Sequence, residues 1–245
     1  YYITFDPSLA QRRYQLHVIE SKDGNRWTRP ALDLFPDEDG NSTNVVIDGL
    51  DDSSLCVFYD TNPACPADQR YKVLSMQFRD RKLDIRTLWC YASGDGYRFG
   101  KPYYVTDKGR FDSLNPFFWK DGKYYGYVRD LHWVDGDCVR DVRLITSEDF
   151  VNWTDQVPLQ YDDGYDYQMY TNNVMIDPRA PHMTIGFPTR YVERKTFTYN
   201  DEQFASLETK LRAGHTIEDR FTRATTDAMF MCSRDGVHFH RYTEA

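Results

Sequence analysis

Short apolar runs followed by polar turns recur along this chain and predict β-strands. The runs LHVIE, LWCYA, VRLIT and AMFMC each lead into a segment that reads S-x-D-[GF]-x-x-[WF]. Asp and Gly favour a tight turn, the Ser or Asp side chain can bond to the turn backbone, and the aromatic residue can begin a return strand. Four copies with similar flanks predict a repeated β unit. The segments begin at Ser21, Ser93, Ser147 and Ser233.

The repeat extends upstream of each turn. A further apolar run precedes each turn, at residues 2–7, 57–63, 126–130 and 185–190. Three of these are themselves preceded by a run with Asn near its start, at residues 44–47, 115–119 and 173–176. Four strands in a unit are typical of a propeller blade. The sequence therefore predicts an all-β fold, a β-propeller of four-stranded antiparallel blades, present as an incomplete set of about four blades.

The predicted blades divide a single partial domain that covers residues 1–245. They are an incomplete blade at 1–30 that lacks its first strand, complete blades at 41–101 and 111–157, and a blade at 167–243 with a polar insert at 196–221. An arc that begins on a second strand and ends on a fourth does not close a ring. Because bare strand edges and apolar faces are rare in proteins, we expect missing blades or a second chain to cover the open edges.

Composition narrows the function classes. Thirty basic against thirty-eight acidic residues give a net charge of -8, and no basic patch is visible, so a nucleic-acid partner is disfavoured. No run of eighteen apolar residues predicts a membrane span. The five Cys residues are scattered, the His residues are not clustered, and phosphate-binding loops and the G-x-S-x-G elbow are absent. We therefore expect no metal and no cofactor, and the N-terminus does not indicate a localisation.

These motifs resemble the five-bladed β-propeller glycosidases, the superfamily of invertases, levanases and arabinanases, and more closely uncharacterised bacterial glycosyl hydrolases. The resemblance covers nearly the whole chain and implies a carbohydrate-active enzyme, a glycoside hydrolase. The W-x-N-D-P-N and E-C stretches of invertases are absent. The turns also resemble the sialidase Asp-box, with one residue fewer between Asp and Gly. The resemblance is carried by the four turns, the segments 59–60 and 70–72, Asp112-Ser113-Leu114-Asn115, Arg129-Asp130 and residues 147–153.

Propeller topology sorts the polar residues into two faces. The start of the first strand and the loop between the second and third strands share one face, and the S-x-D turn lies at the opposite face. Asp23, Asp95, Asp149 and Asp235 are therefore predicted to be structural turn residues. The residues predicted to converge on the pocket face are Asp60, Asp112, Asp130, Asp166, Arg70, Arg129, Arg140, Arg190 and Gln168.

Four carboxylates are candidates for the acid and base that glycoside hydrolysis requires. Asp112, at the start of an inner strand, is the first candidate for base or nucleophile. Asp130 is adjacent in sequence to Arg129, which would keep it ionised, so it suits a base or a stabiliser of the transition state. Asp60 and Glu193 are candidate acids. Each of the four could instead form a salt bridge or cap a loop.

The remaining candidates are substrate-binding residues. Arg70, Arg140 and Arg190 could hold a uronate carboxylate, could bind phosphate as in phosphorylases with related propellers, or could form ion pairs between blades. Tyr170 could stack on a sugar ring. Two other functions therefore stay open, a non-catalytic glycan-binding propeller and a glycoside phosphorylase. The other predicted substrate-binding residues are Asn44, Asn115, Arg129, Gln168 and Asn173.

Overall fold

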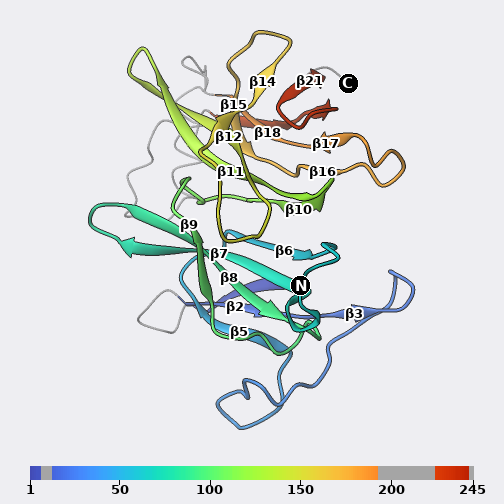
Figure 1. The fold of residues 1–245 in the computed structure, drawn as a ribbon. Helices are drawn as coiled ribbons and strands as arrows, with labels where there is room; N and C mark the ends of the chain where they lie inside the picture. Colours follow the sequence, from blue (N-terminus) through green and yellow to red (C-terminus); the bar gives the residue numbers. More distant parts are fainter. Residues whose placement is uncertain (7–12, 193–223, 243–245) are drawn as a thin grey trace.

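The protein is built almost entirely from antiparallel β-sheets (Figure 1). The computed structural model describes residues 1–6, 13–192 and 224–242. Within these ranges there is one short 3₁₀ turn, Ala67–Gln69, and no α-helix. None of the segments in these ranges forms a helix long and apolar enough to cross a membrane. The fold is thus all-β and propeller-like.

The first two sheets come from the N-terminal half of the chain. The first has the strand order β1-β2-β5, and the β3–β4 hairpin extends from it; the second has the order β6-β7-β8-β9. The strands of the first sheet and its hairpin are β1 (Tyr2–Asp6), β2 (Arg13–His17), β3 (Glu20–Ser21), β4 (Trp27–Thr28) and β5 (Val45–Leu50). Those of the second are β6 (Leu55–Tyr59), β7 (Tyr71–Asp80), β8 (Ile85–Ser93) and β9 (Tyr103–Thr106).

The third sheet has the order β10-β11-β12-β13, and the last region is more irregular. The strands of the third sheet are β10 (Phe117–Lys120), β11 (Lys123–Val134), β12 (Asp137–Ser147) and β13 (Val157–Pro158). The last region holds β14 (Gln160–Tyr161), β15 (Gln168–Thr171), β16 (Met175–Ile176), β17 (Thr184–Gly186), β18 (Thr189–Val192), β19 (Thr225–Ala228), β20 (Phe230–Ser233) and β21 (His238–Tyr242).

The last region is interrupted where its strands bend. Strands β15, β18 and β19 form one small sheet, and β16, β17 and β20 belong to the next one. Each strand of the first set is separated from one strand of the second by a gap of one to three residues in the chain. Pro188 lies in one gap and cannot donate a ladder hydrogen bond, although its carbonyl accepts one from the Met229 amide (3.0 Å). One pair differs from the expected antiparallel pattern, because β14 runs parallel to β21 over two residues.

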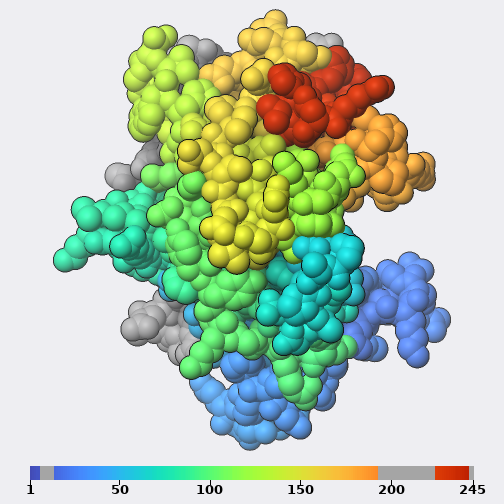
Figure 2. All heavy atoms as spheres, viewed as in Figure 1, coloured from blue at the N-terminus to red at the C-terminus, as the bar shows by residue number. Residues whose placement is uncertain are grey.

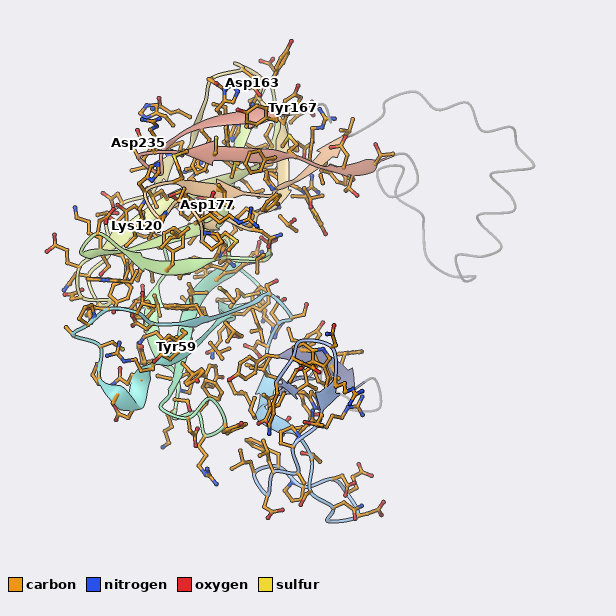
Figure 3. The ribbon with its side chains drawn as sticks, turned by 90° about the vertical axis from the view of Figure 1, so that its right-hand side faces the viewer. Tyr59, Lys120, Asp163, Tyr167, Asp177 and Asp235 are labelled. Atoms are coloured by element: carbon orange, nitrogen blue, oxygen red, sulfur yellow. The ribbon has the colours of Figure 1, made fainter. Side chains whose placement is uncertain are left out.

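The sheets are stacked face to face in sequence order, as the curved arrangement in Figure 3 and the colours in Figure 2 show. Three apolar clusters fill the spaces between successive sheets. Neighbouring residues of one strand enter different clusters: Val73 of β7 faces the first sheet, and Leu74 faces the third. In β11, Tyr127 faces the last sheet and Val128 faces the second. The inner sheets are therefore buried on both faces, and the strands read as continuous apolar runs for this reason.

The four S-x-D turns form as the sequence predicts. In the turn at Ser147, the Phe150 amide donates to Ser147 Oγ (2.9 Å), and the Val151 and Asn152 amides donate to Asp149 Oδ1 (2.9 and 2.7 Å). The other three turns repeat the same bonds. Each turn connects neighbouring antiparallel strands. Burial raises the pKa of Asp95 and Asp235, but the hydrogen bonds outweigh it; the pKa of all four Asp residues is lowered, to about 2 for Asp95.

One strand joins a different sheet from the one that the repeat suggests. The run at residues 44–47 is expected to share a unit with residues 57–60, but β5 pairs with β2 of the first sheet. Strand β6 is then the first strand of the second sheet, β7 is the second and β8 is the third. The sequence pattern counts strands correctly but cannot say which neighbour a strand will pair with. This shift by one strand changes which end of the sheet each loop occupies.

Phe150 gives a sharp test of the turn geometry, because it holds the position of Gly with φ 64° while its side chain is 5% exposed in the core. Phe150→Ala should lower the free energy of unfolding by about 3 kcal/mol. Phe150→Gly should be about 1 kcal/mol more stable than Phe150→Ala, because glycine adopts positive φ without strain. Exposed Val151→Ala is the control and should change stability by less than about 0.5 kcal/mol. Denaturant titration measures all three, and a glycine variant less stable than the alanine variant would contradict the prediction.

Candidate functional site

Asp112 lies in a tightly held loop between β9 and β10. The preceding Phe111 is fully buried and has φ 60°, a conformation that is costly for a bulky residue. The side chain of Asn115 closes the loop by donating to the carbonyls of Phe111 (3.0 Å) and Ser113 (2.5 Å), and it accepts the amide of Arg129 (2.8 Å). The loop thus fixes Asp112 in place, and the predicted residue Asn115 acts as a support for Asp112.

Two arginines lie beside the carboxylate of Asp112. Arg86 Nη1 lies 2.6 Å from Asp112 Oδ2, and Arg129 Nε lies 3.7 Å from Asp112 Oδ1. The Asp112 side chain is 34% exposed. Asp84 also pairs with Arg86 (2.7 Å) and with Arg110. Two guanidinium groups therefore face this carboxylate, which remains partly open to solvent.

Arg129 and Arg140 connect this loop to the last sheet. Arg129 Nη1 donates to the carbonyl of Tyr170 (2.9 Å), which also accepts the hydroxyl of Ser113 (3.0 Å). Arg140 bonds to the Gln168 side chain, and its guanidinium lies over the ring of Tyr191 (4.3 Å). It also lies 5.6 Å from the Tyr170 ring, which is 45% exposed. Five predicted residues therefore meet here: Asp112, Arg129, Arg140, Gln168 and Tyr170.

Asp130 does not join Asp112 in this arrangement. Consecutive residues of a strand point to opposite faces of the sheet, and Arg129 uses the face toward Tyr170. Asp130 instead lies 3.5 Å from Arg143 and lines a hollow with Lys108 and Asp155. The sequence prediction took Arg129 and Asp130 as one constellation because they are adjacent in the chain, but the strand separates their side chains.

Asp60 and Arg70 lie at the opposite end of the stack from Asp112. Tyr59 pairs with Tyr71, and Tyr71 pairs with Ser93 of the S-x-D turn. Figure 3 shows Tyr59 on the same side of the stack as Asp235, which belongs to another of these turns. Asp112, by contrast, contacts Arg86 near the far end of β8. The shift by one strand described above is the reason for the difference from the sequence prediction.

Asp60 is fully buried in a structural network. Its Oδ2 accepts bonds from Lys72 Nζ (2.8 Å) and the Tyr124 hydroxyl (2.9 Å), and its Oδ1 accepts the Asn62 amide (2.9 Å). Burial alone would raise the pKa of Asp60, but the bond and charge of Lys72 outweigh it and lower the pKa. Arg70 donates to the carbonyls of Asp60 (3.0 Å) and Asn62 (2.6 Å). Such contacts support the loop and leave Asp60 unsuited to the role of acid.

The other predicted residues have contacts that do not involve Asp112. Asn44 bonds to the Val18 carbonyl (2.7 Å) in the first sheet. Arg190 forms a two-pronged ion pair with Asp227 (2.9 and 2.5 Å). Asn173 is exposed, whereas its neighbour Asn172 is buried and donates to the Leu114 carbonyl (3.1 Å). Glu193 and the insert at 196–221 lie outside the described residues.

The structure also brings together residues that sequence reasoning missed. Arg86 contacts Asp112, and Tyr191 contacts Arg140. Together with Asp112, Arg129, Gln168 and Tyr170 they form what we call the Asp112 surface. In the sequence, Arg86 and Tyr191 are ordinary strand residues without a motif around them. His132 lies between two carboxylates, with Nε2 2.8 Å from Asp166 and Nδ1 3.3 Å from Asp141. Burial opposes a charge on the ring, yet the bond to Asp166 and the charge of Asp141 raise the pKa of His132. Partners 34 residues apart leave no local signal in the sequence.

Comparison with known proteins gives similarity of fold only. No protein-family model matches the chain, and no curated protein matches it. A GH93 α-L-arabinofuranosidase of Fusarium graminearum, solved with arabinobiose, has a TM-score of 0.50 and 13% identity, covering 96% of this chain and 59% of that one. An α-L-arabinofuranosidase structure from the same organism with an iminosugar inhibitor gives the same values. An N-acetylgalactosamine deacetylase from F. plautii, in complex with blood group B trisaccharide, has a TM-score of 0.47 and 12% identity, covering 91% and 64%.

The chain spans about three-fifths of the length of these solved structures. At 12–13% identity the likeness concerns the backbone arrangement and does not transfer any residue's role. The fold of this protein is therefore a fold found in arabinofuranosidases. The residues of the Asp112 surface must be argued from their own geometry.

Removal of the Asp60 carboxylate tests its structural role. Asp60→Asn should lower the free energy of unfolding by about 3–5 kcal/mol, because it leaves the buried Lys72 ammonium without its counter-ion. Because the pKa of Asp60 is lowered in the folded state, its contribution is present at neutral pH and is lost as the pH falls. Asp155→Asn is the control, since Asp155 is 98% exposed and pairs with Lys108 (2.7 Å). Equal stability of both variants in urea would show that the network is dispensable.

His132 should make the stability of the β11–β12 region depend on pH. A raised pKa means that the stabilisation is complete below the ordinary His value of 6.5 and is lost as the pH rises through the folded-state value. His132→Gln should therefore lower the melting temperature more at pH 6 than at pH 9. His182→Gln, at an exposed site, is the control. An NMR titration that gives His132 a pKa at or below the ordinary value of 6.5 would contradict the assignment.

Proposed function

We propose that this chain belongs to a carbohydrate-active enzyme, a glycoside hydrolase, whose sugar site is the surface around Asp112. The observation that carries the proposal is the placement of Asp112: a strained, hydrogen-bonded loop holds it, two arginines face it, and it remains one-third exposed near the exposed ring of Tyr170. Backbone strain beside a polar side chain is typical of functional sites. An aromatic ring near a carboxylate suits a saccharide, which offers both a face to stack and hydroxyls to bind.

The chemistry assigned to Asp112 is that of a base or nucleophile. An ionised carboxylate can remove a proton from water or attack an anomeric carbon directly. The matching general acid would have to come from another carboxylate with a raised pKa. Asp60 is buried and Asp130 faces the other side of its strand, so neither supplies the acid. Glu193, outside the described residues, keeps its place as a proposed acid.

A non-catalytic glycan-binding role is the second candidate, and one observation favours it. Both oxygens of Asp112 already face guanidinium groups, at 2.6 Å from Arg86 and 3.7 Å from Arg129. A carboxylate so engaged can serve to orient the arginines, and it is a weaker nucleophile than a free one. This candidate predicts sugar binding without turnover.

The propeller itself is also part of the proposal. We infer that the sheets are blades of a five-bladed ring, with the blade boundaries predicted from the repeat adjusted for the pairing of β5. The outer side of the last sheet supports further packing, because the Phe230 ring is tilted against Phe187 (5.5 Å) and stacked on Tyr242 (5.6 Å) while all three remain exposed. Missing blades or a second chain would cover this side.

Asp112→Asn tests the proposed function. The solved arabinofuranosidase binds arabinobiose, so arabinobiose and aryl α-L-arabinofuranosides are the first substrates to try, followed by a panel of aryl glycosides. On a confirmed substrate, the variant should lose turnover by about 10²–10⁴-fold, because the reacting carboxylate is gone while its size is kept. Asp155→Asn should keep full activity.

Two outcomes would go against this assignment. Unchanged turnover in Asp112→Asn would remove Asp112 from the mechanism. Glycan binding in calorimetry with no turnover of any tested glycoside would favour the binding candidate.

A further inference from the structure

A lysine, a cysteine and an aspartate meet where the loop after β6 leads into β7. Lys72 Nζ donates to Asp60 Oδ2 (2.8 Å) and to Cys65 Sγ (3.2 Å). The third hydrogen bond of this ammonium group goes to the carbonyl of Gln69 (2.7 Å). The Lys72 and Asp60 side chains are 3% and 0% exposed, and Cys65 is 8% exposed. Two strong bonds therefore hold the amine nitrogen against the sulfur.

Cys65 differs in its surroundings from the deeply buried thiols. Cys56 and Cys90 lie in the apolar cluster between the second and third sheets. Cys65 instead lies under a surface loop, because residues 66–68, which follow it, are exposed. A cavity of about 540 Å³ beside the loop is lined by Gln69, whose carbonyl also holds Lys72. A small oxidant can therefore come close to the sulfur without separating two sheets.

The neighbouring groups make the thiol slow to react rather than inert. Burial and the hydrogen bond with Asp60 raise the pKa of Cys65, and Lys72 offsets part of this effect. The thiolate is the form that attacks an oxidant, so the reaction at neutral pH requires an excess of oxidant. Once the sulfur is oxidised, the nearest nucleophile is the nitrogen of Lys72.

We propose that Cys65 and Lys72 form a modification site, at which hydrogen peroxide causes the sulfur and the nitrogen to join in a sulfenamide bond. In the first step the Cys65 thiol attacks peroxide. An S–O bond forms and the O–O bond breaks; the sulfur loses two electrons, and the peroxide is reduced to one water molecule. The product is a sulfenic acid, a group that condenses with nearby nitrogen nucleophiles.

Asp60 is the base for the second step. Its carboxylate takes one proton from the Lys72 ammonium, and rotation about the Cε–Nζ bond turns the freed lone pair toward the sulfur. The S–N bond forms as the S–O bond breaks, and the leaving hydroxide takes a second amine proton to become water. The flexible stem of Lys72 allows the two atoms to approach. Because the amine and Asp60 both end neutral, no unpaired charge stays buried.

Mass spectrometry of the folded chain after peroxide treatment tests the site. One cross-link removes two hydrogens, so the mass should fall by about 2 Da, whereas a sulfenic or sulfinic acid raises it by about 16 or 32 Da. After denaturation, four of the five cysteines should react with an alkylating agent, and a disulfide would leave only three. Trypsin should fail to cleave after Lys72, whose peptide should be joined to that of Cys65 until a thiol reductant is added.

Variants assign the cross-link to this pair of residues. Cys65→Ser keeps the Asp60–Lys72 ion pair and should abolish the 2 Da loss, which follows from the stoichiometry of one cross-link. Lys72→Arg keeps the positive charge, but its guanidinium is a poor nucleophile, so peroxide should carry Cys65 on to the sulfinic acid. Cys138→Ser is the matched control, since Cys138 is a partly exposed thiol and its removal should leave the cross-link unchanged. Circular dichroism establishes that each variant is folded.

The inference is independent of the proposed function, and each further outcome decides it. A loss of two hydrogens that persists in Cys65→Ser would overturn it. Sulfinic acid at Cys65 with normal cleavage after Lys72 would show oxidation without cross-linking and would also overturn it, as would five free thiols in a sample whose methionines are oxidised. A gain of about 14 Da with the same two residues joined would support the site and replace the direct bond by an oxygen bridge.

Discussion

Burial of both faces of the inner sheets is the constraint on which the rest of this structure depends. Sheets two and three have neighbours on each side, so alternate residues of β7 and β11 enter different apolar clusters. A strand under this constraint has no solvent face along its centre on which to place polar chemistry. Charged groups must therefore be placed toward strand ends and in loops, or be paired inside the stack. The distribution of carboxylates and arginines in this protein follows from that requirement.

The two ends of the stack meet the requirement in different ways. At one end, Ser and Asp side chains satisfy the turn backbone, and Asp60 and Lys72 pair in a closed network that includes Tyr124. Nearly every polar atom named there has a partner within the protein. At the other end, the Asp112 loop is strained at Phe111 and Arg129 has a buried nitrogen without a hydrogen-bond partner. The second end therefore retains a buried donor, Arg129 Nε, that a ligand could meet.

This contrast also explains why burial alone does not identify a functional carboxylate. Asp60 is the more deeply buried of the two, yet its neighbours provide a complete set of donors. Asp112 is partly exposed, and the arginine beside it is buried and incompletely bonded. The balance between desolvation and available partners, rather than depth, separates a structural ion pair from a candidate site.

The sequence by itself determined the turns and the all-β class. The bonds of each S-x-D turn span only a few residues, so their pattern is local, and four copies make it unmistakable. The sequence also identified Asp112, Arg129, Arg140, Gln168 and Tyr170, which the fold brings together. Tertiary structure alone decided that β5 pairs with β2, which moved Asp60 and Arg70 to the far end of the stack. It also buried Asn172 and left Asn173 exposed, and it placed His132 against Asp166. These features depend on contacts between segments that are distant in the chain. Such contacts produce no periodic pattern of apolar and polar residues, so the sequence alone does not reveal them.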